Sequence, residues 1–289
     1  MVDFAIGENA ESAKRLARNW QGEARMQSES QGQAPLSPIK AARIGVIIPA
    51  LNEEAAIGGV VRAMLAAGTG QIAQCLVVDN GSTDFTASRA FGAGAQVISE
   101  PMRGYGAACL AGMAALANDV DIVVFVDGDG SDAPEDFASI VSPILAGQAD
   151  LVIGSRILGR MEKGAMTAPQ RFGNWLAPAL IRALWGVHFT DLGPFRAISR
   201  SGLERLAMRD RDFGWTVEMQ IKAARLGLRC LERPVQYRRR IGQSKISGTL
   251  RGVVRAGGKI LYVVLREALR IRKPVQPVAI PAPALLAAK

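Results

Sequence analysis

The stretch Ile122-Val123-Val124-Phe125-Val126-Asp127-Gly128-Asp129 decides the fold. It is a short apolar run, rich in β-branched residues, that ends in two aspartates around one glycine, which is typical of a buried strand followed by a turn. Three further apolar runs precede it at residues 44–48, 75–78 and 95–99, and helical patterns follow the first two at residues 52–65 and 83–91. After the third run, a glycine loop at residues 103–106 leads into a helical pattern that continues to about residue 117. This alternation predicts an α/β fold with a mostly parallel central sheet and helices on both faces.

Polar residues follow three of these runs. Asn52 and Glu53 come after the first run, Asp79 ends the second, and Asp127 and Asp129 end the fourth. The carboxyl ends of parallel strands meet at one edge of a sheet, where such folds bind ligands. Two carboxylates on a glycine turn suit Mg²⁺ or Mn²⁺ bound together with substrate phosphates, although the same residues also favour ordinary turns. Their position beside Asp79 favours the metal-binding interpretation.

Composition narrows the class of protein. The chain has 289 residues, of which 49% are hydrophobic and 21% are charged, so it is neither disordered nor fibrous as a whole. Three cysteines without CxxC spacing and a single histidine, His188, argue against a disulfide scaffold or a zinc module. No uncharged apolar run reaches the roughly 18 residues that span a bilayer, and acidic residues stand near the N-terminus. We therefore expect a cytoplasmic protein that does not span a membrane.

The net charge of +9 is concentrated near the C-terminus, where residues 233–273 hold twelve basic residues and one acid, Glu267. Such a segment suggests a partner that carries phosphate groups, either an anionic membrane surface, a phosphorylated substrate or nucleic acid. We expect a basic amphipathic helix at residues 249–273, attached to anionic lipid or packed on its own domain. Its basic stripe consists of Arg251, Arg255, Lys259, Arg266, Arg270 and Lys273.

Short motifs follow one another along residues 43–248 in a specific order. The first three are Pro49-x-x-Asn52-Glu53, Asp79-Asn80-Gly81-Ser82-Thr83-Asp84 and Asp127-Gly128-Asp129. The others are Gly104-Tyr105-Gly106-Ala107-Ala108, Gly154-Ser155-Arg156, Asp191-Leu192-Gly193-Pro194-Phe195-Arg196, Phe213-Gly214-Trp215-Thr216-Val217-Glu218-Met219-Gln220 and Gly242-Gln243-Ser244-Lys245. This order resembles the inverting family 2 glycosyltransferases of GT-A fold. More narrowly, it resembles the branch that includes dolichyl-phosphate mannose synthase and dolichyl-phosphate glucose synthase.

The resemblance implies roles for a set of residues. The nucleotide-sugar would be held by Pro49, Asn52, Glu53, Asp79, Gly104, Asp127 and Gly128, with Asp79 reaching the base. Mg²⁺ or Mn²⁺ would be held by Asp127, Asp129 and Ser131, where Ser131 replaces the glutamine that the mannose synthases commonly carry. The catalytic set would be Asp129, Arg156, Asp191, Arg240 and Lys245, in which the basic residues neutralise the donor diphosphate and the acceptor phosphate.

The reaction implied by the resemblance moves a hexose from UDP-glucose or GDP-mannose to a polyprenyl phosphate, with the enzyme peripheral on the cytosolic face of a membrane. A phosphate acceptor is already an anionic nucleophile, whereas a hydroxyl acceptor needs a carboxylate base, for which Asp191 and Glu218 are the candidates. Two alternatives stay open: a glycosyltransferase with a hydroxyl acceptor, and a basic lipid- or nucleic-acid-binding protein without enzymatic activity. We expect no nucleic-acid partner, and the oligomeric state is open.

The predicted organisation has four parts. Residues 1–40 are polar and small and are expected to form a disordered arm, and residues 41–248 to form the catalytic domain. The basic helix at 249–273 and a Pro-rich mobile tail at 274–289 follow. Residues 172–189 form an apolar stretch with Trp175 and Trp185, which predicts a helix that lies at a membrane interface or closes the core.

Overall fold

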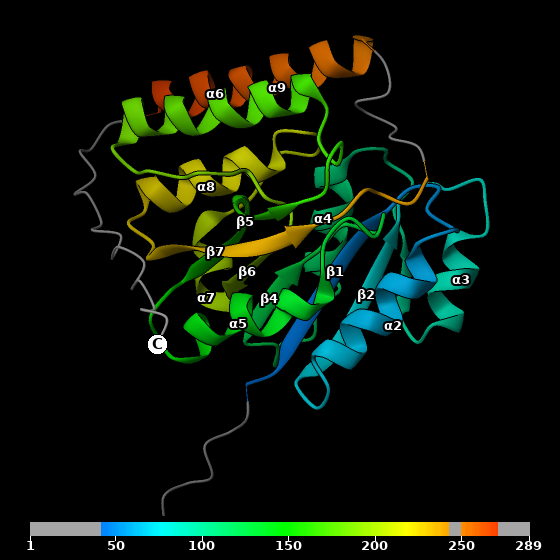
Figure 1. Cartoon of the computed structure of the whole chain (residues 1–289). Coiled ribbons are helices and arrows are strands. Elements are labelled where there is room, and N and C mark those ends of the chain that lie inside the picture. The colour runs from blue at the N-terminus through cyan, green and yellow to red at the C-terminus, as the bar shows by residue number, and fades with distance from the viewer. Residues whose placement is uncertain (1–41, 243–249, 271–289) are drawn as a thin grey trace, which may run out of the picture. The chain divides into compact units, whose positions relative to one another are not determined.

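The computed structural model describes residues 42–242 and 250–270, and the side chains of residues 42–242 and 257–270 (Figure 1). The predicted N-terminal arm, the Pro-rich tail and Lys245 therefore lie outside the described residues. Among the described helices, none combines the length and the hydropathy that crossing a bilayer requires.

A seven-stranded sheet forms the centre of the described part of the chain, with the strand order β3-β2-β1-β4-β6-β5-β7. Strands β1, β2, β3 and β4 are mutually parallel and β7 is parallel to β5, whereas β6 is antiparallel to both of its neighbours. The prediction of a mostly parallel sheet is thus confirmed. The strands are β1 Ile44–Ala50, β2 Ile72–Asp79, β3 Gln96–Ser99, β4 Ile122–Phe125, β5 Leu151–Met161, β6 Arg196–Ser199 and β7 Cys230–Tyr237.

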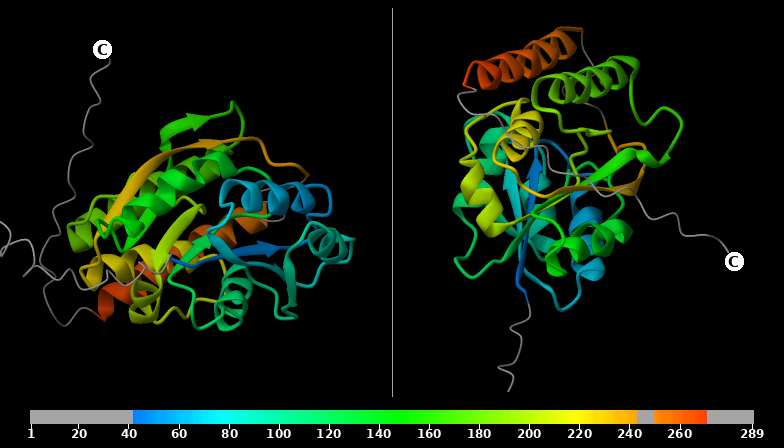
Figure 2. Two further views of the ribbon diagram at one scale, coloured as in Figure 1. Left: turned by 90° about the horizontal axis from the view of Figure 1, so that it is seen from below. Right: turned by 90° about the vertical axis from the view of Figure 1, so that its left-hand side faces the viewer.

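Helices cover both faces of the sheet, as predicted. On one face α2 (Ile57–Ala67), α3 (Thr86–Gly92) and α5 (Phe137–Leu145) contribute to one buried apolar cluster. On the other face α4 (Tyr105–Ala114), α7 (Arg200–Leu206) and α8 (Trp215–Arg225) contribute to a second cluster. Helices α6 (Ala168–Trp185) and α9 (Leu250–Leu269) lie side by side over α8 and form the outermost layer of this face (Figures 1 and 2).

The first predicted helix begins later than its sequence pattern suggests. The pattern starts at Asn52, whereas α2 starts at Ile57. Asn52 has a left-handed backbone, with φ of 53°, and its N–H donates to the Ser82 hydroxyl at 2.9 Å. The chain between β1 and α2 is therefore held as a loop over the end of β2, at the sheet edge where ligands are expected.

Two helical glycines offer a matched test of packing. A Cβ added to Gly106 in α4 would overlap the carbonyl oxygen of Asp210, whereas a Cβ added to Gly59 in α2 would meet no atom within 4 Å. We expect Gly106→Ala to lower the free energy of unfolding by about 1–3 kcal/mol, because the loop at Asp210 must move. Gly59→Ala should raise it by about 0.5–1 kcal/mol, because alanine loses less backbone entropy in a helix. Urea unfolding of both variants measures this, and a neutral Gly106→Ala would contradict the close approach.

Candidate functional site

The carboxyl ends of β1, β2 and β4 meet at one edge of the sheet, as the sequence predicts. In the parallel ladders Ala50 pairs with Asp79, and Ile47 pairs with Phe125 two residues before Asp127. A cavity of about 370 Å³ lies at this edge. It is lined by Pro49, Ala50, Leu51, Asn52, Glu53, Asn80, Arg103, Gly104, Tyr105, Ala108, Asp127, Gly128, Asp129, Asp212, Phe213 and Arg240. We refer to it as the donor-side cavity.

Asp127 and Asp129 face this cavity from the turn that follows β4. Asp129 is 7% exposed, and one of its carboxylate oxygens accepts the Ser131 N–H at 2.9 Å. Asp127 Oδ1 is buried and accepts no hydrogen bond from the described residues. Burial, reinforced by the neighbouring charge of Asp129, raises the pKa of Asp127 to about 7. A cation bound at this turn would give the unpaired oxygen a partner and would reduce the repulsion between the two carboxylates.

Arg240 closes the same corner of the cavity from the segment after β7. Its guanidinium lies 2.8 Å from Glu53 Oε1 and 3.4 Å from Asp129 Oδ2. It therefore joins the end of β1 to the turn after β4, although the two carboxylates are far from Arg240 in sequence. Because Arg240 Nε is buried without a hydrogen-bond partner among the described residues, the guanidinium retains a donor for a bound anion.

The loop after β2 holds the next part of the cavity wall through Asn80. The Asn80 amide donates to the carbonyl oxygens of Glu100 and Met102, and its oxygen accepts the Gly104 N–H at 2.7 Å. Asp79 itself does not line the cavity, and its carboxylate accepts the Ser82 N–H at 3.2 Å. The contact between Asp79 and a nucleotide base consequently stays a prediction, and Asn80 is a wall residue that the sequence did not single out.

Close packing explains why glycine occupies positions 104 and 106. A Cβ on either glycine would overlap a backbone carbonyl of the segment Asp210–Arg211. In addition, the Ala107 N–H donates to the carbonyl oxygen of Arg211 at 2.9 Å. The segment that precedes α8 thus lies directly on the start of α4, and places Asp212 and Phe213 in the cavity wall.

A second cavity, of about 500 Å³, adjoins the first and extends toward the α6–α9 layer. The two share Tyr105, Asp127, Asp129, Phe213 and Arg240. The remainder of the second lining is mostly apolar and comes chiefly from α6 and α9: it consists of Arg156, Met166, Pro169, Gln170, Phe172, Gly173, Asn174, Leu176, Ala177, Leu192, Pro194, Thr216, Tyr237, Gly257, Ile260 and Leu261. We refer to it as the acceptor-side cavity.

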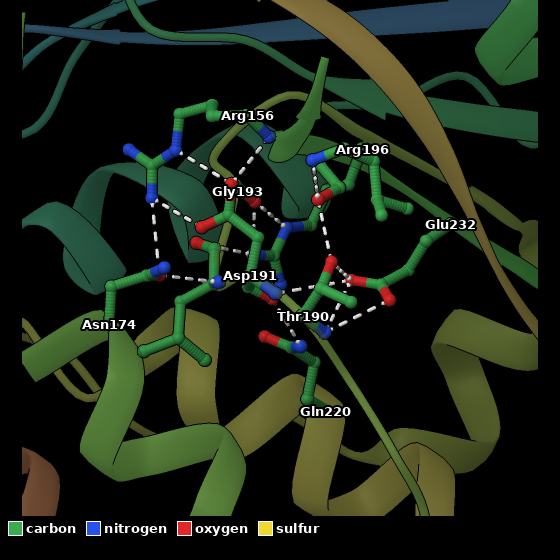
Figure 3. A network of polar contacts seen from close by, with 11 residues as sticks. Arg156, Asn174, Thr190, Asp191, Gly193, Arg196, Gln220 and Glu232 are labelled. Atoms are coloured by element: carbon green, nitrogen blue, oxygen red, sulfur yellow. Dashed lines mark hydrogen bonds and ion pairs between the residues drawn. The ribbon is translucent and has the colours of Figure 1, made fainter. Parts of the chain in front are cut away.

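Arg156 reaches this cavity because β5 bulges beside it. Ser155 pairs with Pro234 of β7 and Arg160 pairs with Gln236, so residues between them on β5 loop out of the ladder. The Arg156 guanidinium binds the Asp191 carboxylate at 2.7 and 2.8 Å (Figure 3). It also lies 4.9 Å from the centre of the Tyr237 ring. Although burial disfavours its charge, the hydrogen bonds with Asp191 raise the pKa of Arg156 above its ordinary value.

A buried polar network holds Asp191 in turn (Figure 3). Glu232 of β7 accepts the N–H groups of Thr190 and Asp191, and Gln220 of α8 donates to the Asp191 carbonyl at 2.9 Å. Asn174 of α6 accepts the Leu192 N–H at 2.8 Å and also approaches Arg156. The network therefore fixes Arg156 from three elements, and sequence spacing gave no signal for the parts played by Glu232 and Asn174.

The two carboxylates considered as general bases are both engaged in ion pairs. Asp191 is fully buried and both of its oxygens contact Arg156. Glu218 is fully buried as well and contacts Lys222 and Arg266 at 3.0 and 2.9 Å. Burial alone would raise the pKa of Glu218, but the N–H groups of Asp210 and Arg209 and the Lys222 ammonium lower it below its ordinary value. Neither carboxylate lines the described cavities.

The C-terminal helix has the opposite orientation to the one that its basic stripe suggests. Lys259, Arg266 and Arg270 pair with the buried acids Asp210, Glu218 and Glu267. The exposed side chains of α9 include Leu261, Tyr262, Leu265 and Leu269. The expectation that the stripe faces lipid or solvent is therefore wrong for Lys259 and Arg266, because the acids that they neutralise lie in the protein interior. Arg270 pairs with Glu267 but remains exposed, as the stripe predicts. The side chains of Arg251, Arg255 and Lys273 lie outside the described residues.

With this geometry established, comparison with known proteins identifies the family. A family model described as Glycosyl transferase family 2 matches residues 45–207. The chain belongs to glycosyl transferase family 2. It is 37% identical over 214 residues to an uncharacterised glycosyltransferase of Mycobacterium tuberculosis, which covers 73% of this chain and 93% of the relative. The resemblance derived from the motifs is thereby confirmed, and the protein is a glycosyltransferase.

Two further relatives indicate the range of substrates in the family. A dolichyl-phosphate hexose transferase of Haloferax volcanii is 35% identical over 232 residues, covering 79% of this chain and 96% of the relative. The crystal structure of glucosyl-3-phosphoglycerate synthase from Mycobacterium tuberculosis, in complex with Mn²⁺, UDP-glucose and phosphoglyceric acid, superposes with a TM-score of 0.64 at 28% identity. That match covers 78% of this chain and 80% of the other. It confirms the GT-A fold.

The residues at the end of β4 fit a divalent metal such as the Mn²⁺ in the structure of glucosyl-3-phosphoglycerate synthase. Asp127 and Asp129 supply carboxylate oxygens beside the cavity, and Asp127 Oδ1 is unpaired among the described residues. No group of three or more His, Cys, Asp or Glu residues in the described part of the chain is placed to hold a metal ion. Mg²⁺ in proteins is usually bound by one or two carboxylates together with substrate phosphates. Ser131 lines neither cavity, and its N–H supports Asp129 instead. Its role as a third ligand stays a prediction.

Because the pKa of Asp127 is raised, replacing this carboxyl with a neutral group should increase the free energy of unfolding by an amount that depends on pH. Below its folded pKa of about 7, Asp127 is protonated in the folded state but ionised in the unfolded state above about pH 4, so its penalty to stability grows with pH up to about 7. In EDTA, Asp127→Asn should therefore stabilise the protein, by an amount that increases by roughly 2 kcal/mol from pH 5.5 to pH 7. Urea unfolding at the two pH values measures this.

The exposed Asp119→Asn variant is the control and should show no such pH dependence, since the Asp119 side chain is 50% exposed. If Asp127→Asn had a lower free energy of unfolding than the wild type at both pH values, the interpretation of Asp127 as a buried carboxylate with an unpaired oxygen would be wrong.

Proposed function

We propose that this glycosyltransferase moves a hexose from a nucleotide-sugar, UDP-glucose or GDP-mannose, to a polyprenyl phosphate at a membrane surface. The observation that carries the proposal is the acceptor-side cavity, whose lining is mostly apolar and includes Arg156 and Arg240. A mostly apolar cavity with two arginines in its wall matches a lipid chain with a phosphate head. Relatives named dolichyl-phosphate hexose transferase and undecaprenyl-phosphate mannosyltransferase support the same acceptor class.

The donor-side cavity is the proposed nucleotide-sugar site. The two cavities meet at Asp127, Asp129 and Arg240, so a diphosphate bound there would present its sugar to the acceptor-side cavity. Pro49, Asn52, Glu53, Gly104 and Gly128 line the donor-side cavity, in agreement with their proposed role in nucleotide binding. Crystal structures of glucosyl-3-phosphoglycerate synthase with UDP-glucose and Mn²⁺ support a donor of this class.

The proposed chemistry depends on charge at the junction of the cavities. When the sugar leaves the nucleotide, the oxygens of the departing diphosphate gain negative charge, and Arg240 is placed to stabilise it. A metal held by Asp127 and Asp129 would supply further stabilisation of that leaving group. Arg156, fixed by Asp191, would orient the acceptor phosphate. In this proposal Asp191 is therefore a positioning residue, which acts through Arg156.

An acceptor phosphate also agrees with the state of the nearby carboxylates. A hydroxyl acceptor requires a base, but Asp191 and Glu218 are buried in ion pairs and line neither described cavity. A phosphate monoester is already anionic at neutral pH and attacks without a base. This favours a polyprenyl phosphate over a hydroxyl acceptor.

Peripheral membrane contact is proposed for the α6–α9 layer. Phe172 and Leu261 line the acceptor-side cavity and are also exposed on the outer surface, so the cavity continues into an exposed apolar region. In that region Trp175 is 64% exposed and Leu265 is 63% exposed. Because Lys259 and Arg266 of α9 pair with buried acids, we propose that apolar insertion rather than attraction to anionic lipid attaches this layer.

Thermal unfolding with nucleotides tests the donor site. The panel contains UDP, GDP, CDP, UDP-glucose and GDP-mannose, each with and without Mn²⁺. A ligand at 100 times its dissociation constant stabilises the protein by about 2.7 kcal/mol, so we expect a midpoint shift of a few degrees with one base. Asp129→Ala should lose the metal-dependent shift, whereas the exposed Asp119→Ala should keep it. A full shift in Asp129→Ala would contradict the metal assignment.

Transfer assays test the acceptor and the membrane surface. We expect product with undecaprenyl phosphate in phosphatidylcholine vesicles and none with 3-phosphoglycerate; the reverse result would overturn the acceptor. The double variant Trp175→Ser/Leu265→Ser should lose vesicle binding and about tenfold in rate on vesicles, while its rate in detergent is retained. Phe91→Ser is the matched control, since Phe91 is 74% exposed on α3. Equal vesicle binding by the two variants would place the membrane contact elsewhere.

A further inference from the structure

The segment Arg209–Gly214, which we call the junction segment, forms part of the donor-side cavity without belonging to a helix or strand. Its residue Phe213 lines both cavities, and Asp212 lines the donor-side cavity. Its backbone packs on the start of α4, where a Cβ on Gly104 or Gly106 would overlap it. The shape of the nucleotide-sugar site therefore depends on where this segment is held.

Asp210 organises the junction segment from within. Its Oδ1 accepts the N–H groups of Asp212 and Gly214 at 2.9 and 3.1 Å. Its side chain is fully buried, and Oδ2 accepts no well-aligned hydrogen bond from the described residues. The contact of Oδ2 is instead the ammonium group of Lys259, at 3.0 Å, from α9. A buried carboxylate in this position needs that cation, because an uncompensated charge is strongly disfavoured away from water.

A second ion pair links α9 to the start of the same segment. Glu218 accepts the N–H groups of Arg209 and Asp210 through Oε2, at 3.1 and 2.7 Å. Its Oε1 contacts Arg266 of α9 at 2.9 Å. Lys259 of α9 thus neutralises Asp210, and Arg266 of α9 shares the neutralisation of Glu218 with Lys222 of α8.

The same part of α9 also borders the other substrate. Ile260 and Leu261, which follow Lys259 directly, line the acceptor-side cavity. One helix therefore contributes apolar lining to the acceptor-side cavity while its inward-facing cations hold a wall of the donor-side cavity. The adjacent layers of α9, α8 and the sheet are visible in Figure 2.

We propose that Lys259 and Arg266 are positioning residues of the nucleotide-sugar site, acting through Asp210 and Glu218 on the junction segment. The role of that site rests on the proposed function above. Formation of the donor-side cavity in its binding shape requires α9 in place, so the C-terminal helix is a part of the donor site in addition to a wall of the acceptor site.

Three variants of the full-length chain separate positioning from general stability. Lys259→Met removes the cation from Asp210, and Lys259→Arg keeps a cation there. Arg270→Met is the control, because Arg270 pairs with Glu267 on α9 and contacts no residue of the junction segment among the described side chains. Hydrogen exchange of the peptide that contains residues 208–216 reports on the segment without any ligand. Binding of UDP and of GDP, each with Mn²⁺, reports on the site.

We expect exchange in this peptide to be at least tenfold faster in Lys259→Met than in the wild type, and unchanged in Arg270→Met. Nucleotide affinity should fall about tenfold in Lys259→Met, with Lys259→Arg close to wild type. Equal exchange in Lys259→Met and Arg270→Met, or unchanged nucleotide affinity in Lys259→Met, would overturn the proposal. If the wild type binds neither nucleotide, both the proposed function and the role of Lys259 in the nucleotide-sugar site are overturned. Hydrogen exchange then shows independently whether Lys259 orders the junction segment.

Discussion

Burial of carboxylates is the constraint on which much of this structure depends. Asp191, Asp210, Glu218 and Glu267 are almost completely removed from water, and each is paired with at least one arginine or lysine. Removing one partner of such a pair typically costs about 3–5 kcal/mol, because the remaining charge is left buried. These pairs therefore fix the relative positions of the elements that carry them, which include the bulge of β5, the start of α8 and the part of α9 from Lys259 onward.

The same constraint distinguishes the site from the scaffold. Among the described carboxylates, Asp127 has an unpaired buried oxygen and a pKa raised to about 7 by burial and by Asp129, whereas the scaffold carboxylates are matched by cations. Asp132, next to it, shows the same pattern, because burial and the charge of Asp127 raise its pKa well above its usual range. Buried carboxyl groups that retain their protons to unusually high pH are thus concentrated on the turn after β4, at the edge of the sheet where the two cavities meet. A cationic or metal-bearing ligand gains most at such a place.

The sequence was sufficient to predict the sheet edge but not the orientation of α9. Apolar runs and the residues that follow them are local features, so the convergence of Asn52, Asp127 and Asp129 could be inferred from strand order alone. Helical spacing likewise predicted an amphipathic α9. It could not show which side of α9 is buried, because that depends on acids contributed by α8 and by the junction segment. The hydrogen bonds of Glu232 and Asn174 could not be predicted for the same reason, because their partners come from elements that are distant in sequence.

The inverted orientation of α9 changes how the basic composition of the chain should be understood. A cluster of lysines and arginines suggests an anionic partner when it is solvated. Here Lys259 and Arg266 are used inside the protein, where they neutralise Asp210 and Glu218, so they contribute little field at the surface. Apolar side chains such as Leu265 are left on the outside of the same helix. Lipid contact by this layer would consequently depend on buried apolar area, which salt does not screen, whereas attachment by an exposed basic stripe would weaken as ionic strength rises.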